Sequence, residues 1–469
     1  MTARPEHSPP VLRVVDDDLC IGCGVCAGVC RRGNLRMEWD GRSLLGPAAL
    51  GECPASCTLC GDVCPFGPSV ENEDALAHEL YSGVDGVRHR PETGLWLGAY
   101  VGSVSVGDYR ARGASGGMAS WFLCKLLDSR TVDRVACVIP TGDPDCHFRY
   151  QLFERSDDVA RCAKSAYHPV ELSGVVSAIL DQPARYAAIA LPCFAKALRL
   201  AALRLPVLRE RLVVVCGLVC GQLKSRAFAE YLTLHAGLDP RSTPWVSFRE
   251  KIAGRPAGNF AFVARAGDKQ GLVDRASQAY DRTWSTGQFR PHACGCCDDV
   301  FAETADIAFM DAWLPAYRAD PRGTSLVLTR SAAADAVVRQ GITDRDLALT
   351  PIGIDGIIRS QRGVLVQKRQ LLASRLWLAQ RAGQSVPRKR VEPRRPGWLT
   401  AWKLDALEEL RQASHAAAPA LERDGLDAYD AAIAQPLGRV ERIRQVERWL
   451  GAPRALAGRA RRLLMRSKP

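Results

Sequence analysis

The sequence predicts a protein of mixed α/β and α+β class, with a cysteine-rich N-terminal module and a helical C-terminal tail. Three observations support this fold class. Eight cysteines fall within residues 20–64, in two tight runs. Short apolar segments then alternate with helical periods up to about residue 240, and strand-like segments dominate the block that follows. Residues 399–469 have the apolar spacing of amphipathic helices.

The two cysteine runs have the spacing of [4Fe–4S] cluster ligands. They are Cys20-x2-Cys23-x2-Cys26-x3-Cys30 and Cys53-x3-Cys57-x2-Cys60-x3-Cys64. Two-residue gaps let three thiolates of one loop reach three irons, and the fourth ligand usually comes from the other run. We therefore expect one cluster on Cys20, Cys23, Cys26 and Cys64, and the other on Cys53, Cys57, Cys60 and Cys30. Residues 13–75 are predicted to form a bacterial-type, ferredoxin-like 2[4Fe–4S] module.

Other kinds of cysteine site fit these runs less well. Zinc sites use four ligands in separated pairs, and a disulfide scaffold is typical of short secreted chains. Two departures from the usual pattern remain. Cys30 is followed by Arg31 rather than proline, and the second run opens with a three-residue gap, which makes Cys53 its weakest ligand candidate. The module is too small for a core of its own, so the clusters are expected to act as staples.

Length and composition describe a globular protein without a membrane span. The 469 residues suffice for about two or three domains, and the hydrophobic content of 47% is ordinary. No run of about 18 apolar residues occurs, so we expect no transmembrane helix. The start of the chain, MTARPEHSPP, lacks the apolar region of a secretory signal. We therefore expect a cytoplasmic protein, whose thiols stay reduced and available for iron.

The net charge of +12 comes from one end of the chain. The basic excess lies within residues 359–469, and the rest of the chain is close to neutral. No zinc-finger or RNA-binding signature accompanies the arginines, so we expect no nucleic-acid partner. A solvated helical face is the favoured interpretation. The alternative is that the basic tail docks on an anionic membrane surface or an acidic partner.

The middle of the chain is predicted to contain two blocks. Residues 97–240 read as an α/β part and residues 241–382 as an α+β part that ends in a long helix near Ala382. Residues 383–398 are rich in proline and arginine and read as a linker, and residues 399–469 as two or three helices. The α/β strands are expected at 97–106, 134–140, 186–192 and 212–218, with helices near 116–128, 172–181, 194–204 and 222–236.

A second set of cysteines predicts a third cluster. Cys193 and Cys220 each follow a predicted strand, where ligand groups gather in α/β domains. Cys294 and Cys297 form a local CxxC pair that suits two corners of a metal site. Other cysteines have the simpler interpretation of buried apolar residues, which fits Cys124, Cys137 and Cys162 well. Cys216 and Cys296 remain alternative ligands.

A glycine-rich segment opens one predicted helix. In RARGASGGMASWF (residues 110–122), Ser115 is placed to cap the helix, and Gly116 and Gly117 let a ligand approach backbone N–H groups. The segment matches neither a Walker motif nor GxGxxG, so a capped helix after a tight turn is an equally good interpretation.

Taken in order, several motifs resemble a known family. They are ASGG before a helix, LPCFAKALR, a GL-x-C-G turn, FREKIAG, CxxCDD with ADIAFMDAW, and GTSLVLTR. This set resembles the beta subunit of the coenzyme F-420 (deazaflavin) reducing hydrogenase and its relatives. Those relatives include 7-hydroxymethyl chlorophyll a reductase and proteins of exopolysaccharide gene clusters. The resemblance covers about residues 18–382 and does not extend to 399–469.

The resemblance implies a flavin-binding core with FAD beside [4Fe–4S] clusters. It implies that the ASGG segment lies at the FAD and that AKSAYHP faces the flavin. One departure is Met310, which stands where the family tends to have glycine before Asp311. The implied cofactor contacts are Arg112, Ser115, Gly116, Gly117, Arg249 and Lys251, and the implied catalytic candidates are Lys164 and Tyr167, with His168 beside them.

These features predict an iron–sulfur flavoprotein oxidoreductase. It would pass electrons between the clusters and FAD, with hydride transfer to or from a deazaflavin coenzyme or an unsaturated organic substrate. The expected partner is ferredoxin or another electron-carrier protein. A non-catalytic electron-transfer subunit, docked through residues 399–469, is the first alternative. A reductase of a polysaccharide pathway is the second.

Overall fold

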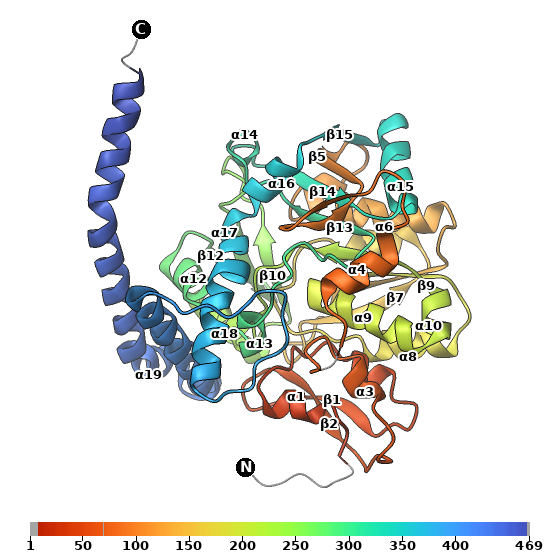
Figure 1. Cartoon of the computed structure of the whole chain (residues 1–469), viewed down its shortest axis with the longest axis horizontal. Coiled ribbons are helices and arrows are strands. Elements are labelled where there is room, and N and C mark those ends of the chain that lie inside the picture. The colour runs from red at the N-terminus through yellow and green to blue at the C-terminus, as the bar shows by residue number, and fades with distance from the viewer. Residues whose placement is uncertain (1–7, 69, 467–469) are drawn as a thin grey trace.

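The computed structural model describes residues 8–68 and 70–466, with side chains as far as Leu450. Residues 1–7, which carry most of the segment used to judge a secretory signal, lie outside this part. Figure 1 shows three regions: the N-terminal module, a central body built on a large sheet, and a C-terminal helix along one flank.

The N-terminal module is a two-stranded hairpin with three short helices. Val25, Val29 and Val63 are fully buried in it, and they join the main core rather than a separate one. Its link to the body includes a hydrogen bond from Leu172 N to Cys23 O of 2.8 Å. The elements are α1 (Leu12–Asp16), α2 (Val25–Gly28), β1 (Leu35–Trp39), β2 (Leu45–Ala49) and α3 (Leu59–Asp62).

A connecting segment leads from the module into the body. It holds α4 (Glu73–Tyr81), capped by the Asn72 side chain, which accepts from Ala75 N at 2.9 Å. The hairpin of β3 (Arg88–Arg90) and β4 (Gly94–Trp96) follows.

The central sheet has eight strands in the order β15-β5-β14-β13-β9-β8-β6-β7. Its middle is parallel (β6, β8, β9, β13) and its flanks are antiparallel. Apolar runs such as Tyr186–Ala190 are buried on both faces, as expected for covered parallel strands. The strands are β5 (Gly98–Val104), β6 (Arg134–Pro140), β7 (Phe148–Phe153), β8 (Tyr186–Ala190), β9 (Leu212–Leu218), β13 (Ile307–Asp311), β14 (Ser325–Thr329) and β15 (Leu347–Pro351).

The sheet takes strands from both predicted blocks, 97–240 and 241–382. β13 pairs in parallel with β9, and β14 then pairs with β5. Only β10 (Trp245–Glu250), β11 (Ala261–Ala266) and β12 (Lys269–Asp274) form a separate antiparallel sheet. The two blocks are therefore interleaved in space, a relation that a linear reading of strand spacing cannot show.

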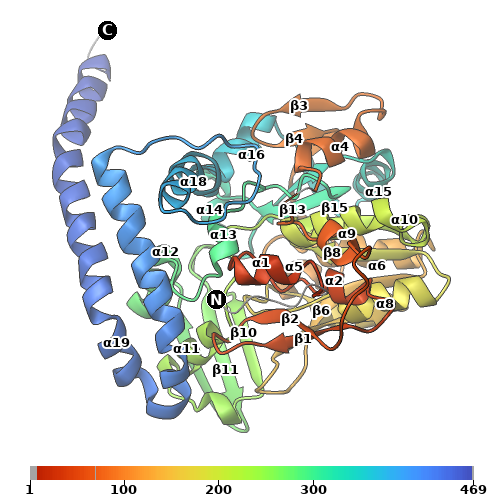
Figure 2. The ribbon, with the colours of Figure 1, turned by 60° about the horizontal axis from the view of Figure 1, so that its bottom comes forward.

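Helices cover both faces of the central sheet (Figure 2). Apolar residues of α6 and α15 pack into one core, and those of α8, α9, α10 and α11 belong to another, which extends to the module and the tail. These helices are α6 (Met118–Asp128), α8 (Ser173–Asp181), α9 (Pro192–Arg204), α10 (Pro206–Arg211), α11 (Ala227–His235) and α15 (Ala332–Thr343). Shorter helices in the loops are α5 (Tyr109–Arg112), α7 (Ser156–Val159), α12 (Thr283–Thr286), α13 (His292–Gly295), α14 (Pro315–Arg318), α16 (Ile354–Ser360) and α17 (Arg362–Leu365).

The C-terminal region begins with α18 (Leu371–Arg381) and an irregular segment that leads to α19 (Trp398–Arg466). Gly425, at φ 80° and ψ −166°, breaks α19 into two limbs. The limbs run antiparallel, since Lys403 Nζ contacts Glu447 at 2.8 Å. Figures 1 and 2 show the second limb running on past the body. Within the described residues, every helix is too short or too polar to span a bilayer.

Candidate functional site

Four cysteines of the module face the body and are called the inner group: Cys20, Cys23, Cys26 and Cys64. Burial raises the pKa of Cys23, and negative charge on Cys64 and Cys20 raises it further. Burial and the other three thiols act in the same direction on Cys26. Backbone N–H groups donate to these sulfurs, for example Gly22 N to Cys20 Sγ at 3.4 Å. Such N–H donors stabilise thiolates and tune a cluster bound to them.

The remaining four cysteines of the module form an outer group: Cys30, Cys53, Cys57 and Cys60. The pKa of Cys60 is raised to about 11, first by burial and then by charge on the other three thiols. Asn34 Nδ2 donates to Cys53 Sγ at 3.7 Å. Residues 49–52 and 54–56 are exposed, so this group lies close to the surface.

The first cysteine loop depends on glycine at two positions. Gly22 and Gly24 have φ values of 68° and 75°, a left-handed conformation that other residues rarely adopt. A Cβ atom on Gly24 would also lie 2.2 Å from Glu171 Oε2. The sequence CIGCGVC is therefore shaped by close packing against the body as well as by its thiol spacing.

Four cysteines of the body converge and are called the core group: Cys193, Cys220, Cys294 and Cys297. They come from the start of α9, the loop after β9, and α13 with the residues after it. Burial raises the pKa of Cys193, and the other three thiols of the group raise it further. Leu223 N donates to Cys294 Sγ at 3.3 Å.

A buried lysine faces the core group. Lys368 Nζ donates to Cys297 Sγ at 3.1 Å and to Asp299 O at 2.8 Å. Burial would lower the pKa of Lys368, but charge on Cys297, Cys220 and Cys294 raises it instead. The fully charged ammonium offsets part of the negative charge that four thiolates gather, which fits an anionic cluster at this position.

The two alternative cysteines have partners outside the core group. Cys216 is buried within β9, where Asp306 and Arg199 are its charged neighbours. The Cys296 Sγ atom is 3.7 Å from His292 Nε2, and His292 Nδ1 is 3.4 Å from Glu408. Burial alone would lower the pKa of His292, but its contacts with Cys296 and Glu408 raise it to about 10.

The three thiol groups suit clusters better than single ions. Among the described residues, no three His, Cys, Asp or Glu side chains converge closely enough to hold one metal ion. A cubane holds its ligand sulfurs farther apart, because an iron stands between each sulfur and the centre of the cluster. The donor sets, each of four thiols with N–H or ammonium donors nearby, therefore fit [4Fe–4S] groups.

The inner group adjoins the core group. Burial raises the pKa of Tyr150, and charge on Cys137, Cys193 and Cys23 raises it further, so this ring lies near both groups. The Tyr150 hydroxyl donates to Ile189 O at 2.9 Å. A small cavity is lined by both Cys20 and Leu223, and Leu223 contacts Cys294.

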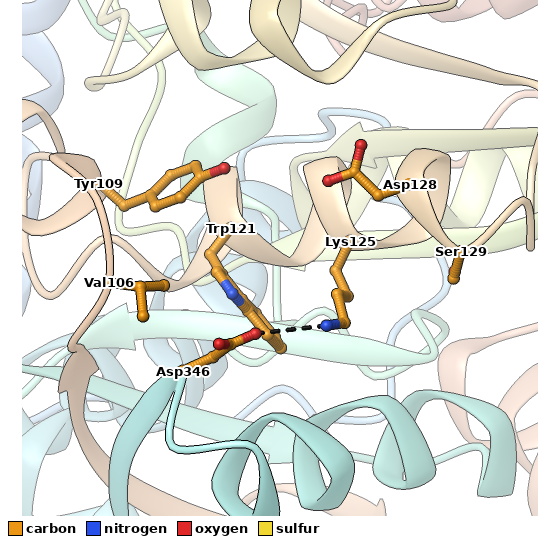
Figure 3. A pocket seen from close by; sticks show the side chains of 7 residues that line it. All are labelled: Val106, Tyr109, Trp121, Lys125, Asp128, Ser129 and Asp346. Carbon is orange, nitrogen blue, oxygen red and sulfur yellow. Dashed lines mark hydrogen bonds and ion pairs between the residues drawn. The ribbon is translucent and has the colours of Figure 1, made fainter.

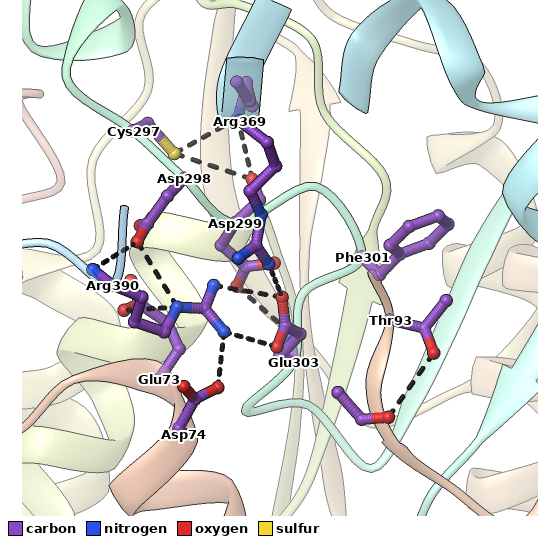
Figure 4. Close-up of polar contacts among 12 residues, drawn as sticks. Glu73, Asp74, Thr93, Cys297, Asp298, Asp299, Phe301, Glu303, Arg369 and Arg390 are labelled. Atoms are coloured by element: carbon purple, nitrogen blue, oxygen red, sulfur yellow. Dashed lines mark hydrogen bonds and ion pairs between the residues drawn. The ribbon is translucent and has the colours of Figure 1, made fainter. Parts of the chain in front are cut away.

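A buried ionic network fixes the segment that carries Cys294 and Cys297 (Figure 4). At its centre, Arg390 donates to both oxygens of Glu303 at 2.6 and 3.0 Å and to Asp298 at 3.3 Å. Lys389 lies 3.6 Å from Asp298, and Arg369 donates to Glu303 at 2.9 Å. The arginine-rich linker has no regular secondary structure. The side chains of its Lys389 and Arg390 are nevertheless buried rather than solvated.

The network leaves one carboxyl group in an unusual state. Asp299 is buried, and its pKa is raised to about 7 by burial and by the nearby charges of Glu303 and Glu73. One of its oxygens accepts from Glu303 N at 3.0 Å, whereas Oδ1 has no partner.

The predicted cofactor loop lies among four basic side chains, called the cation group: Arg110, Lys164, Arg249 and Lys251. Lys251 Nζ donates to Ser115 O at 2.9 Å and also to Arg110 O. Its pKa is lowered to about 8, first by burial and then by the charges of Arg110, Lys164 and Arg249. Concentrated positive charge beside backbone N–H groups is a suitable environment for phosphate oxygens.

Carboxylates neutralise most of the cation group but not Lys251. Arg249 makes a two-point contact with Asp311 at 2.7 and 3.0 Å, and Arg110 pairs with Asp320 at 2.9 Å. Lys164 pairs with Glu250. Among the described residues, Lys251 donates its hydrogen bonds only to carbonyl oxygens, so it is the cation of this group best placed to meet an anionic ligand.

The glycine-rich loop differs from its expected role as a helix cap. Ser115 does not cap α6, whose N-cap is Gly117; instead, Ser115 Oγ donates to Thr324 O at 2.7 Å. Gly116 N donates to Ser325 Oγ at 2.9 Å, and a Cβ atom on Gly117 would lie 2.6 Å from Tyr109 C. Internal packing alone thus requires glycine here, and the loop is held against the start of β14.

The two catalytic candidates lie on a single irregular segment. Lys164 has a left-handed φ of 99°, which directs it toward β10 and Glu250. Tyr167 packs on Trp284, with ring centroids 4.7 Å apart. Its pKa is raised, first by burial, and the charges of Arg249, Asp311 and Cys220 also act on it. Tyr167 therefore lies between the cation group and the core group.

Two other predicted residues have different surroundings. His168 is buried among aromatic rings, and its pKa is lowered to about 3 by burial and by His147. It is therefore neutral at ordinary pH. Arg112 is largely exposed and forms a 3.3 Å ion pair with Asp108, so it lies at the edge of the loop.

A cavity lies elsewhere, along α6 (Figure 3). It has a volume of about 370 Å³ and is open to solvent on one side. An ion pair of 3.3 Å between Lys125 and Asp346 forms part of its wall, with the Trp121 ring behind it. No predicted cofactor residue lines this cavity.

Sequence reasoning missed Lys368, Arg110 and the acidic partners of the network. Lys368 lies in a π-helical turn, Val366–Gln370, within a longer helical stretch. Because a lysine on a helix normally lies on a solvated face, nothing in the sequence indicated that Lys368 would be buried. The paired acids Asp298 and Asp299, directly after Cys297, were the one visible sign that buried cations would be needed nearby.

Three family descriptions match this chain. Residues 99–177 match the N-terminal part, and residues 184–354 the C-terminal part, of the coenzyme F420 hydrogenase/dehydrogenase beta subunit. Residues 13–36 match a 4Fe-4S binding domain. These matches span the first cysteine run, the cofactor loop and the core group.

A solved structure is also similar to part of this chain. A chain in the xenon-derivatised F420-reducing [NiFe] hydrogenase complex from Methanosarcina barkeri is 15% identical, with a TM-score of 0.49. The match covers 62% of this chain and 96% of that one. No curated protein sequence matches the chain.

Proposed function

The chain belongs to the family of coenzyme F420 hydrogenase/dehydrogenase beta subunits, and on that premise we propose that it is an iron–sulfur flavoprotein oxidoreductase. The family consists of oxidoreductase subunits, and the 4Fe-4S match adds an electron-transfer module. The observation that carries the proposal is the arrangement of three four-thiol groups, of which the core group adjoins Tyr167 and the cation group.

Twelve cysteines hold the clusters in this proposal. The inner and outer groups bind the two clusters of the module, and the core group binds a third. Such clusters supply one-electron transfer when bound. The protein's own part is to bury the thiols, donate N–H bonds to them and place Lys368 against Cys297.

The cation group and the glycine-rich loop hold the phosphates of FAD in this proposal. A flavin converts single electrons into hydride transfer when bound. Lys251 supplies the free positive charge, while Arg249 fixes the end of β10 through Asp311. Ser115, Gly116 and Gly117 keep the loop backbone close to β14, and Arg112 closes its exposed edge.

Lys164 and Tyr167 form the wall that faces the reacting ligand. Tyr167, packed between Trp284 and Phe248, excludes water from the side of the core group. Lys164 Nζ donates a hydrogen bond to Glu250, and this contact holds the Lys164 side chain in place within the cation group.

The outer group lies close to the surface, which gives an electron-carrier protein access to the module. Leu50 is 54% exposed beside it, and the flanking loop is open to solvent. A ferredoxin or a similar carrier is the proposed partner there, and a deazaflavin coenzyme or an unsaturated organic compound is the proposed substrate at the body.

Replacing Lys251 by methionine is expected to weaken FAD binding by about tenfold or more, because a charge-assisted hydrogen bond contributes about 1.5–3 kcal/mol. Affinity of the unmodified protein should also fall between about pH 7 and about pH 9. The Lys251 ammonium, with its pKa lowered to about 8, loses its proton over that range. Equilibrium dialysis of flavin-stripped protein measures both effects.

The matched control is Lys269→Met, which removes an exposed lysine from β12 in the same region of the chain. It should leave the FAD affinity and its pH dependence unchanged. Equal affinity of the Lys251→Met variant and the unmodified protein would remove Lys251 from the phosphate site.

Anaerobic reduction tests the function as a whole. Protein loaded with iron, sulfide and FAD should lose cluster absorbance when reduced deazaflavin is added, and the flavin absorbance should change with it. Protein that binds clusters but neither contains nor binds flavin would instead act as an electron-transfer subunit, and the proposal would be withdrawn.

A further inference from the structure

Exposed tryptophans gather where the two limbs of α19 meet at their open end. Trp398 and Trp402 begin the first limb and are 68% and 36% exposed, and Trp449 and Leu450 on the second limb are 83% and 50% exposed. No other tryptophan is among the strongly exposed apolar residues of the described chain. The ion pair between Lys403 and Glu447 holds the two limbs at the same level.

The apolar face of the second limb continues beyond the point where this limb is buried against the body. Val440 and Ile443 are fully buried, Val446 is half-buried, and Leu450, on the same helical face, is exposed. Beyond this level the helix continues to Arg466 and extends away from the body in both views (Figures 1 and 2). Among the described residues, none covers this face at the level of Leu450.

Basic residues predominate on both sides of this apolar end in the sequence. Arg394 and Arg395, both exposed, directly precede Trp398 in the chain. Glu447, two residues before Trp449, is already paired with Lys403, and Glu392 is an exposed acid two residues before Arg394. From residue 448 onward the sequence has no Asp or Glu, and its basic residues are Arg448, Arg454, Arg459, Arg461, Arg462, Arg466 and Lys468.

We propose that this end of α19, with Trp398, Trp402, Trp449 and Leu450 at its base, binds the surface of an anionic lipid bilayer. Tryptophan favours the boundary between headgroups and acyl chains, where its ring is buried and its N–H stays hydrated. A basic helix of this kind lies in the plane of the interface and does not cross it. Charge complementarity selects anionic lipid as the occupant, since an uncharged apolar partner gives the basic residues no role.

Vesicle binding of the full-length protein tests the proposal. The protein should sediment with phosphatidylcholine vesicles that contain about one third phosphatidylglycerol, and much less with phosphatidylcholine alone. Salt at about 0.5 M should release most of it by screening. The double change Arg461→Gln with Arg462→Gln removes two charges and should weaken binding about thirtyfold.

Apolar substitutions separate insertion from simple charge attraction. Trp449→Ala with Leu450→Ala should abolish most of the binding that remains at about 0.15 M salt. Leu272→Ala is the matched control, because Leu272 is 54% exposed on β12 and far from α19 in sequence. Iron content and thermal unfolding of the Trp449, Leu450 and Leu272 variants should be unchanged, since these side chains are exposed.

Three results would overturn the proposal. The first is the absence of binding to phosphatidylglycerol vesicles. The second is unchanged binding of the Trp449→Ala, Leu450→Ala protein. The third is a dimer, seen by light scattering, that dissociates in that variant without any vesicle binding, which would make a second copy of the chain the occupant.

Discussion

Replacing Cys193 and Cys220 together by alanine is expected to remove about four iron atoms per chain, because the core group then keeps too few thiols to hold a cubane. The two side chains come from different strand ends and meet Cys294 and Cys297 only in the folded body. Iron and acid-labile sulfide, measured on anaerobically purified protein, should fall in parallel. The clusters of the module should persist, since their eight thiols belong to separate groups.

The control for this change is Cys216→Ala. Cys216 is also a buried cysteine at the end of a central strand, but its charged neighbours are Asp306 and Arg199 rather than the core group. Its replacement should leave iron unchanged. If the Cys193, Cys220 variant also kept all its iron, the core group would be a set of structural thiols, and no third cluster would exist.

Replacing Arg390 by methionine is expected to destabilise the fold by about 3 kcal/mol, because it leaves buried carboxylates without their main partner. Arg390 bridges Glu303 and Asp298 from the linker and also contacts Asp74 of α4 at 2.7 Å. Arg369 and Lys389 remain as weaker partners, so the loss should lie at the lower end of the range for a broken buried pair. The midpoint of urea-induced unfolding measures it.

Arg388→Met provides the comparison, since Arg388 is an exposed residue of the same linker, two positions earlier. Its unfolding midpoint should match that of the unmodified protein. Equal stability of the Arg390→Met variant would mean that the network contributes little and that the linker is held by other contacts.

Much of the body follows directly from local patterns. The apolar runs 134–140 and 212–218 coincide with β6 and β9, because parallel strands covered on both faces must be apolar throughout. The helix predicted at 172–181 corresponds to α8, Ser173–Asp181. Gly425, which ends the first limb of α19, adopts a backbone conformation that no periodicity argument anticipates.

Long-range relations could not be predicted in the same way. Nothing in the spacing of IAFMD indicates that β13 inserts between β9 and β14, because strand order depends on contacts distant in sequence. The same holds for Arg390, whose proline-rich surroundings are typical of a solvated linker. Its buried ion-pair partners, Asp298 and Glu303, lie about ninety positions away in the sequence.

In the cofactor loop, residue types alone do not distinguish a ligand site from internal packing. Two adjacent glycines before a helix are typical of a ligand cradle, but Gly117 is required by the nearby Tyr109 backbone whether or not a ligand binds. The stronger sign of an anionic ligand is Lys251, which lacks a carboxylate among its described partners. Its importance depends on neighbours from three separate segments and becomes visible only in the folded chain.

The most direct test is the joint determination of iron, acid-labile sulfide and flavin in protein purified and reconstituted without oxygen. Three four-thiol groups beside one flavin site predict about twelve iron and about twelve sulfide per chain, with about one FAD. Zinc in place of iron, or iron without sulfide and flavin, would contradict the account.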